Sequence, residues 1–446
     1  MSKATLKAFT NKPALPTITV STRGAARLKS GHPWVYRSDV TASPEVQPGA
    51  TVQVLDPHGK LQGTALYSSS SQIAIRMIAS SKEEVTDLPT LIADRIRAAI
   101  NYRKKFVENT DAYRIVFSEA DFLPGLIIDR YNDVLSLQIL TQAMDAEPTR
   151  GAIIETLVEE LKPAGIVERV DPRIRDLEQL PPRDSSLLWG KKSSTIITMN
   201  GGTEPRAETQ DSYQGTPSGV PNDSPNRRAF RRGPREDEPG TAAVRFHYDG
   251  LEGQKTGAFL DQRENYAAAA HDAHGDALDV FCYQGGFALH LATKCTTVTG
   301  IDSSRPALEM ADKNAALNNR EVEWIEANAF DLLRDYAAAG KKYDTVVLDP
   351  PAFAKTKRDL DKALSGYKEL NLRALKMLRP GGILVTCSCS YRVSQADFIG
   401  MLADAARDAH RTLRLAEVRG QSRDHPVLLN IPETAYLKCV VAIVSQ

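Results

Sequence analysis

A short apolar run that ends in a glycine pair occupies residues 279–287 and reads Asp279-Val280-Phe281-Cys282-Tyr283-Gln284-Gly285-Gly286-Phe287. Glycine at the end of a strand lets a ligand approach the backbone closely. The next apolar run begins roughly 20 residues later and ends in Asp302, where a bound nucleoside would present its ribose hydroxyls. The two runs predict a nucleoside site at the carboxyl ends of neighbouring parallel strands.

Apolar β-branched runs alternate with helical patterns throughout the C-terminal part of the chain. We expect strands at 277–281, 297–301, 323–326, 345–348 and 383–386, and helices near 287–294, 306–318, 359–377 and 395–410. This alternation predicts an α/β fold with a parallel, doubly wound sheet. Two later runs, 413–418 and 436–444, would add an antiparallel edge hairpin to that sheet.

A chain of 446 residues should contain several compact units. Short strands broken by turn residues predict a small β domain at 1–84, and a helical pattern at 85–110 predicts a connecting helix. A second α+β unit is expected at 111–200. Residues 201–241 contain too few large apolar side chains to form a core, so we expect a disordered insertion at a hairpin tip. The α/β domain would then span 242–446.

Composition bears on RNA binding, on the redox state of the cysteines and on membrane association. Lysine plus arginine equal aspartate plus glutamate at 56 each, so RNA affinity would have to come from local patches. The five cysteines show no paired metal spacing, which favours reduced thiols in a cytoplasmic protein without a bound metal. We find no signal peptide and no apolar run of about 18 residues, so no membrane association is expected. The oligomeric state stays open, with a homodimer as one option.

Basic and aromatic residues interleave between the first two expected strands, in residues 23–37. Cationic groups can bind phosphates while flat rings stack on bases. The candidate RNA-binding residues are Arg23, Lys29, His32, Trp34 and Arg37. The alternative interpretation is a solvated turn whose aromatic side chains belong to the core.

Two further strand ends carry reactive side chains. Asp349 is followed by two prolines, and Cys389 lies between Ser388 and Ser390. Since strands of an open α/β sheet present ligand-contacting groups at their carboxyl ends, this acid and this thiol are expected over one pocket. A thiolate that adds to carbon 6 of cytosine makes carbon 5 nucleophilic, and the acid could hydrogen-bond the ring during addition. Cys387 is the rival nucleophile, although its deeper position favours burial.

The expected cofactor is S-adenosylmethionine. The residues assigned to it from the strand-end pattern are Asp279, Phe281, Tyr283, Gly285, Gly286 and Asp302. A dinucleotide is poorly supported because the loop lacks the G-x-G-x-x-G pattern that cradles a pyrophosphate. S-adenosylmethionine has no phosphate and does not require that pattern.

The chain resembles the bacterial large-subunit (23S) ribosomal RNA cytosine-5 methyltransferases that carry an N-terminal PUA domain. The matching segments are 31–35, 122–131, 253–257, 260–263, 281–283, 348–351, 366–368, 388–390 and 424–426. The resemblance implies a PUA domain, a central α+β domain and a Rossmann-like class I methyltransferase domain. It also implies that Lys255 and the segment Asp261, Gln262 and Arg263 line the cofactor pocket, and that Cys389 is the nucleophile.

The chain departs from this family at three places. Asn328 stands where related enzymes often carry an aspartate that contacts adenine, and an amide can still hydrogen-bond there. Ala352 stands where two-cysteine RNA enzymes place a second thiol, and the 201–241 insertion is foreign to the pattern. Two alternative functions stay open: a nitrogen-directed methyltransferase of the same fold, which needs no thiol, and a non-catalytic RNA-binding assembly factor. A dinucleotide oxidoreductase is a weaker third alternative.

Overall fold

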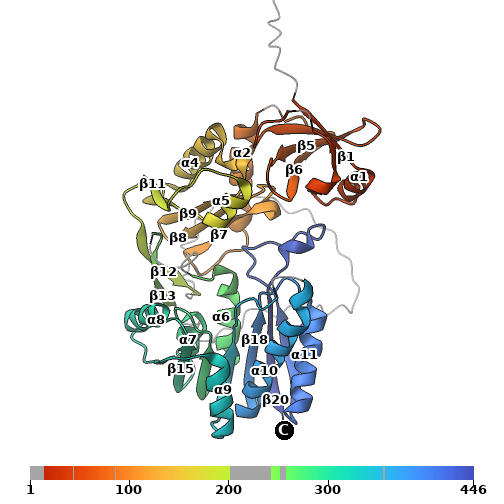
Figure 1. Cartoon of the computed structure of the whole chain (residues 1–446). Coiled ribbons are helices and arrows are strands. Elements are labelled where there is room, and N and C mark those ends of the chain that lie inside the picture. The colour runs from red at the N-terminus through yellow and green to blue at the C-terminus, as the bar shows by residue number, and fades with distance from the viewer. Residues whose placement is uncertain are drawn as a thin grey trace, which may run out of the picture.

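The computed structural model describes residues 15–43, 45–85, 87–200, 243–251, 258–354 and 357–445, and every structural statement below refers to them. The 201–241 insertion and Lys255 lie outside the described residues. The chain forms a β domain, a central α+β domain and a C-terminal α/β domain (Figure 1). No helix in these ranges combines the length and the apolar character needed to cross a bilayer.

The N-terminal domain is a six-stranded sheet with the order β2-β6-β5-β4-β1-β3. Its strands are β1 (Thr17–Val20), β2 (Trp34–Tyr36), β3 (Val40–Ala42), β4 (Thr51–Leu55), β5 (Leu61–Tyr67) and β6 (Ile73–Ser80). A turn at 56–59 joins β4 to β5, which pair in antiparallel register. A helix that the sequence did not predict, α1 (Thr22–Lys29), buries only Gly24 and Ala25. Such small side chains leave no apolar periodicity to detect.

The central domain is a five-stranded sheet with the order β11-β10-β9-β8-β7. Its elements are α2 (Leu88–Arg103), β7 (Ala112–Phe117), β8 (Leu126–Tyr131), β9 (Val134–Ile139), α3 (Gln142–Asp145), α4 (Glu147–Leu161), β10 (Gly165–Glu168), α5 (Pro172–Glu178) and β11 (Ser186–Gly190). The helix expected as a connector, α2, buries Ile92 and Ile96 in the same core as Ile153 and Leu157 of α4. It is therefore part of the central domain's core as well as a connection.

A hairpin leads from the central domain to the C-terminal domain. The strands β12 (Ser194–Met199) and β13 (Val244–Asp249) pair in antiparallel register, as the sequence predicted for the two sides of the insertion. Tyr248 of β13 stacks on Tyr131 of β8 with ring centroids 3.7 Å apart. This contact fixes the hairpin against the central sheet.

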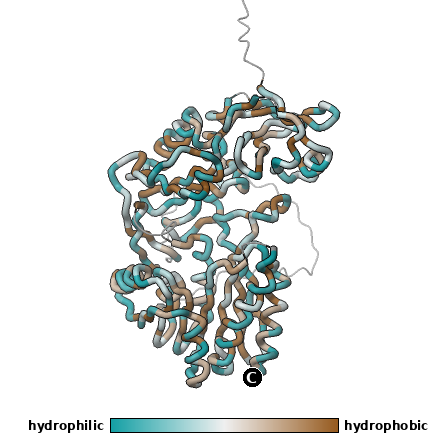
Figure 2. Tube along the Cα trace, in the orientation of Figure 1, coloured by the Kyte–Doolittle hydropathy of each residue, from teal (hydrophilic) through white to brown (hydrophobic). Residues whose placement is uncertain are grey.

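The C-terminal domain is a seven-stranded sheet with the order β16-β15-β14-β17-β18-β20-β19, in which β20 runs antiparallel to its neighbours. Its strands are β14 (Asp276–Val280), β15 (Thr297–Asp302), β16 (Glu323–Glu326), β17 (Tyr343–Leu348), β18 (Leu378–Ser388), β19 (Thr412–Arg419) and β20 (Lys438–Ser445). The predicted doubly wound sheet with an antiparallel edge hairpin is confirmed. Figure 2 shows hydrophobic residues gathered along these strands.

Helices cover both faces of this sheet. They are α6 (Arg263–Asp272), α7 (Gly286–Leu291), α8 (Arg305–Leu317), α9 (Ala329–Ala338), α10 (Leu360–Met377) and α11 (Gln395–Asp408). Residues of α6, α7 and α8 share one core with Val347 and Val385. Residues of α9, α10 and α11 share another with Val346 and Leu384, the neighbouring positions along the same strands. Since successive strand residues point to opposite faces, the two cores lie on opposite sides of the sheet.

A turn of the C-terminal domain inserts between the domains at Asp424. Its carboxylate accepts a hydrogen bond from the backbone N–H of Arg114 at 2.8 Å, and its carbonyl accepts one from the Arg103 guanidinium at 2.8 Å. Arg263 contacts the same carboxylate at 3.4 Å. The neighbouring His425 packs on Phe117 with ring centroids 5.4 Å apart. These buried contacts tie the central domain to the C-terminal domain.

Candidate active site

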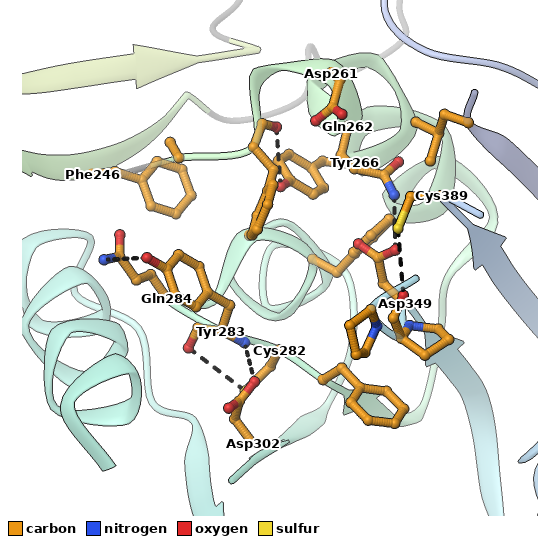
Figure 3. A pocket seen from close by; sticks show the side chains of 18 of the residues that line it. Phe246, Asp261, Gln262, Tyr266, Cys282, Tyr283, Gln284, Asp302, Asp349 and Cys389 are labelled. Atoms are coloured by element: carbon orange, nitrogen blue, oxygen red, sulfur yellow. Dashed lines mark hydrogen bonds between the residues drawn. The ribbon is translucent and has the colours of Figure 1, made fainter. Parts of the chain in front are cut away.

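A cavity of about 450 Å³ opens at the carboxyl ends of β14, β15, β17 and β18 (Figure 3). This is the edge of an open α/β sheet where ligands bind. The hairpin contributes Met199 and Phe246 to its wall. The other lining residues are Ala258, Phe259, Asp261, Gln262, Tyr266, Phe281, Cys282, Tyr283, Gln284, Gly286, Phe287, Asp302, Ser303, Asp349, Pro350, Pro351, Ala352, Cys389 and Leu437.

The loop after β14 has an unusual backbone. Phe281, Tyr283 and Gly285 all have positive φ, at 68°, 49° and 86°. The N–H groups of Phe281 and Cys282 both donate to the Ile301 carbonyl, at 2.9 and 3.0 Å, which holds the loop against β15. Left-handed residues other than glycine are uncommon and are found mainly where the surroundings impose them, often at ligand sites.

The two glycines of this loop are required for different reasons. Gly285 adopts a left-handed conformation that a side chain would strain. A Cβ atom at Gly286 would lie 2.6 Å from the ring of Tyr266, inside van der Waals contact. Tyr266 itself lines the cavity and donates to the Phe259 carbonyl at 3.3 Å. Gly286 therefore allows α6 and α7 to approach each other beside the cavity.

Asp302 lies at the end of β15 and faces the cavity. Its two carboxylate oxygens accept hydrogen bonds from the backbone N–H groups of Tyr283, at 3.0 Å, and Ser304, at 2.9 Å. This arrangement fixes the carboxylate while leaving it open to hydroxyl donors. The Tyr283 ring meets Phe259 edge to face at 5.2 Å, which gives the cavity an aromatic wall next to Asp302.

Asp279 lies beneath the cavity and is fully buried. One carboxylate oxygen accepts from the Ala288 N–H at 2.8 Å, and the other has no hydrogen-bond partner within the described residues. Burial, with smaller contributions from Asp349 and Asp302, raises the pKa of Asp279 to about 8. Its visible role is to hold the start of α7, and its unpaired oxygen is the kind of buried acceptor that a bound ligand or water satisfies.

Asp349 follows the last residue of β17 and points into the cavity (Figure 3). Its carboxylate accepts a hydrogen bond at 3.0 Å from the side-chain amide of Gln262, which Asn265 holds in turn at 2.7 Å. Burial raises the pKa of Asp349 to about 7, and nearby Asp261 adds to this effect. A carboxyl group of this pKa can donate a hydrogen bond as an acid or accept one as a carboxylate at neutral pH.

Cys389 follows the last residue of β18 and also faces the cavity. Its Sγ lies 3.9 Å from the carbonyl oxygen of Pro350, the residue after Asp349. The thiol and the acid therefore meet over one pocket. Burial raises the pKa of the Cys389 thiol to about 11, and Asp349 and Asp261 contribute in the same direction. Cys387 is fully buried opposite Cys439 of β20 and does not line the cavity, as its deeper position suggested.

Ser390 connects the segments that carry the thiol and the acid. Its hydroxyl oxygen accepts hydrogen bonds from the backbone N–H groups of Phe353 and Ala354, at 3.0 and 3.3 Å. The Tyr367 hydroxyl lies 2.9 Å from the same oxygen. This network was not assigned from the sequence, although both residues lie in the quoted segments 366–368 and 388–390.

Two residues assigned to the cofactor lie elsewhere. Asn328 is exposed and caps α9, where its side-chain oxygen accepts from the N–H groups of Phe330 and Asp331. Arg263 is buried and turns towards Asp424 and Glu264. Neither residue lines the cavity, so its geometry gives no support to these two assignments. Asp261 and Gln262 of the segment expected at the pocket do line the cavity, and Phe259 lines it without having been singled out.

The basic and aromatic segment of the N-terminal domain is held largely by protein contacts. Arg37 donates to the carbonyls of Ser68 and Ser71, and Arg23 pairs with Asp39 at 2.7 Å. The indole of Trp34 donates to Glu119 of the central domain at 3.0 Å. His32 lies 3.3 Å from Glu433 of the C-terminal domain, and Lys29 is exposed. Trp34 and His32 thus join the domains, whereas Arg23 and Lys29 keep exposed cationic side chains.

Comparison with known proteins agrees with this architecture. Residues 18–80 match the PUA-like domain family, and residues 238–441 match the S-adenosylmethionine-dependent methyltransferase family. Ribosomal RNA large subunit methyltransferase I of Shewanella frigidimarina is 35% identical over 426 residues, which cover 93% of this chain and 96% of that protein. The protein of the same name from Photobacterium profundum is 34% identical over 420 residues, covering 92% and 95%.

Solved structures show the same fold. SMU.776, crystallised in complex with SAH, has a TM-score of 0.74 at 17% identity and covers 96% of this chain and 100% of its own. A second structure, from Streptococcus mutans, has a TM-score of 0.73 at 16% identity with the same coverage. The chain therefore belongs to the family of S-adenosylmethionine-dependent methyltransferases that includes ribosomal RNA large subunit methyltransferase I.

Proposed function

We propose that this protein methylates carbon 5 of a cytosine in large-subunit (23S) ribosomal RNA through a covalent bond from Cys389. The observation that carries the proposal is the juxtaposition of Cys389 with Asp349 over one cavity, with Sγ 3.9 Å from the Pro350 carbonyl. A methyltransferase that acts on a ring nitrogen has no need of a thiol at this place. Cytosine carbon 5, in contrast, becomes nucleophilic only after a thiolate adds to carbon 6.

The residues present fit S-adenosylmethionine. The fixed carboxylate of Asp302 would hold the ribose hydroxyls, and the aromatic wall of Phe259 and Tyr283 would contact the adenine. The cavity volume of about 450 Å³ lies in the range of small-molecule sites. When bound, the cofactor supplies an electrophilic methyl group. Lys255, expected at this pocket from the family resemblance, lies outside the described residues.

Cys389 acts as the nucleophile in the proposed reaction, and Asp349 acts as the acid that protonates the ring. The Cys389 thiol loses its proton to solvent, and the sulfur forms a bond to carbon 6 while Asp349 gives its proton to the ring nitrogen on which charge develops. A pKa of about 7 suits this role, because the acid is substantially protonated at neutral pH. After methylation a base removes the carbon-5 proton, the sulfur leaves as a thiolate and the ring nitrogen returns its proton to Asp349.

Recognition of the RNA would combine the N-terminal domain with the rim of the cavity. Arg23 and Lys29 expose cations there, and phosphate contacts of this kind position an RNA without reading its sequence. Because the net formal charge of the chain is zero, this local patch would supply the attraction. The proposed place of action is the cytoplasm, and a homodimer stays a prediction that light scattering would test.

The test is covalent trapping on RNA that contains 5-azacytidine. The wild type should form an adduct that survives denaturation, Cys389→Ala should form none and transfer no methyl group, and Cys387→Ala should retain the adduct. Cys295→Ala is the matched control, since Cys295 does not line the cavity. Methyl transfer that survives in Cys389→Ala would instead indicate a nitrogen acceptor and would overturn the proposal.

A further inference from the structure

Lys438 is the first residue of β20 and stands opposite Ser388 of β18. It is only 7% exposed, and its ammonium group donates to the carbonyl oxygens of Ser390, at 2.6 Å, and Tyr436, at 2.9 Å. Within the described ranges no carboxylate lies at ion-pair distance from it, whereas Lys192, for example, pairs with Asp133 at 2.7 Å. Lys438 is therefore a buried cation bound to neutral acceptors beside the segment that carries Cys389.

A buried ammonium group without a counterion is unfavourable, because two carbonyl dipoles only partly replace its hydration. Burial lowers the pKa of Lys438 to about 8, and Cys389 acts in the opposite direction. A methionine of similar length would fill this space without that cost. The charge at this position therefore needs a reason beyond packing.

The surroundings of Cys389 supply that reason. Asp349 at the end of β17 and Asp261 before α6 disfavour a negative charge on the sulfur, as burial does. Tyr367 of α10 is a further titratable neighbour, and Tyr436 lies between Asp261 and Lys438. A backbone N–H at Cys389 and the Lys438 ammonium group both favour the thiolate, and Lys438 is the cation of the two.

We propose that Lys438 is a positioning residue for Cys389, which fixes the backbone after the thiol through the Ser390 carbonyl and supplies the positive charge that stabilises the thiolate. The inference rests on the proposed role of Cys389 as the nucleophile. It deepens that role by assigning the group that offsets the two carboxylates. The same charge would favour departure of the sulfur as a thiolate at the end of the reaction.

The test measures thiolate formation directly, with no RNA or cofactor present. The rate at which iodoacetamide alkylates Cys389 is followed against pH, and fragment-resolved mass spectrometry separates Cys389 from Cys387 in the shared peptide. Below about pH 8, where Lys438 carries its charge, we expect Lys438→Gln and Lys438→Met to slow alkylation of Cys389 by up to roughly tenfold, and the difference from the wild type should vanish at higher pH as Lys438 loses its proton. Lys438→Arg, which keeps the cation, should restore most of the rate.

The matched control is Lys342→Gln. Lys342 also donates to a backbone carbonyl, that of Lys376 at 2.7 Å, but it is exposed and precedes β17 at the opposite end of the sheet. Its alkylation profile should equal that of the wild type. If Lys438→Gln folds with a wild-type melting curve and leaves the profile unchanged, the inference is overturned. Should Lys438→Met not fold, the comparison of the glutamine and arginine variants decides the question.

This assay separates the inference from the function on which it rests. Failure of the wild type to form an adduct with 5-azacytidine RNA would refute the covalent mechanism, whatever Lys438 does to the thiol. An adduct in the wild type together with unshifted alkylation in Lys438→Gln would leave the covalent mechanism intact and remove Lys438 from it.

Discussion

Replacement of Asp349 by asparagine should make the protein more stable and inactive at the same time. The carboxyl group has an ordinary pKa of 3.8, and burial raises it to about 7 in the folded protein. An acid whose pKa is raised by folding binds its proton more tightly in the folded state. Its contribution to the free energy of unfolding is therefore largest below the unfolded pKa and is lost as pH rises towards about 7.

The magnitude follows from the same shift. A difference of about 3 pH units corresponds to roughly 4 kcal/mol between the charged and neutral forms. The side chain lines an open cavity and is partly exposed, so water reduces this figure and 4 kcal/mol is a ceiling. We expect Asp349→Asn to raise the free energy of unfolding by about 2–4 kcal/mol near pH 8, and by less than half of that near pH 5. The retained Oδ1 still accepts from Gln262.

The assay is thermal unfolding of the cofactor-free protein at both pH values. For a domain of about 200 residues, a change of 1 kcal/mol in the free energy of unfolding shifts the melting temperature by about 2–4 °C. The melting temperature near pH 8 should therefore rise by several degrees. Methyl transfer should fall by about 100-fold or more, since an amide cannot give a proton to the ring. Asp335→Asn, an exposed aspartate of α9, is the control and should change neither quantity. A variant that is destabilised near pH 8, or whose gain is independent of pH, would refute the reasoning.

Two further predictions concern packing around the site. Asp424→Asn should lower the free energy of unfolding by about 2–4 kcal/mol in denaturant titrations, because it leaves the buried Arg263 with Glu264 as its remaining counterion, whereas Asp404→Asn in an exposed pair should cost under about 1 kcal/mol. Gly286→Ala should weaken S-adenosylmethionine binding roughly tenfold in calorimetry, because its Cβ would displace the ring of Tyr266, which lines the cavity. Gly151→Ala, with open space around its Cβ, should leave affinity unchanged. Unaltered stability or unaltered affinity, respectively, would contradict these two expectations.

Much of the C-terminal fold was predictable because its central strands are short, mainly apolar runs separated by helical patterns. The strands β14, β17 and β18 were placed to within a few residues on this signal. The helices α6 and α9 were missed for local reasons. The helix α6 begins at the last residue of the Asp261 to Arg263 segment, which had been assigned to the cofactor pocket. The helix α9 begins directly after Asn328, which had been assigned to the cofactor.

Side-chain direction was the part that the sequence could not supply. Arg263 and Gln262 are neighbours in one segment, yet one turns to Asp424 and the other to Asp349. The partner of Arg263 lies 161 residues further along the chain, and no local pattern reveals such a contact. Asn328 shows the same limit, because a side chain that can bind adenine can equally cap a helix, and the helix was not foreseen.

Burial raises the pKa of both reactive groups of this site, with opposite consequences for the proposed reaction. It raises the pKa of Asp349 into the neutral range, which keeps the acid ready to donate a proton to a ring nitrogen. It also raises the pKa of the Cys389 thiol to about 11, which opposes formation of the thiolate that must attack the ring. Exposing the site to water would lower the pKa of the Cys389 thiol and so favour the thiolate. It would also lower the pKa of Asp349, which would then be ionised at neutral pH. A cation next to the segment that carries the thiol resolves this conflict, because it favours the thiolate without rehydrating Asp349, and Lys438, bound to the Ser390 carbonyl, is the residue to which we assign this role.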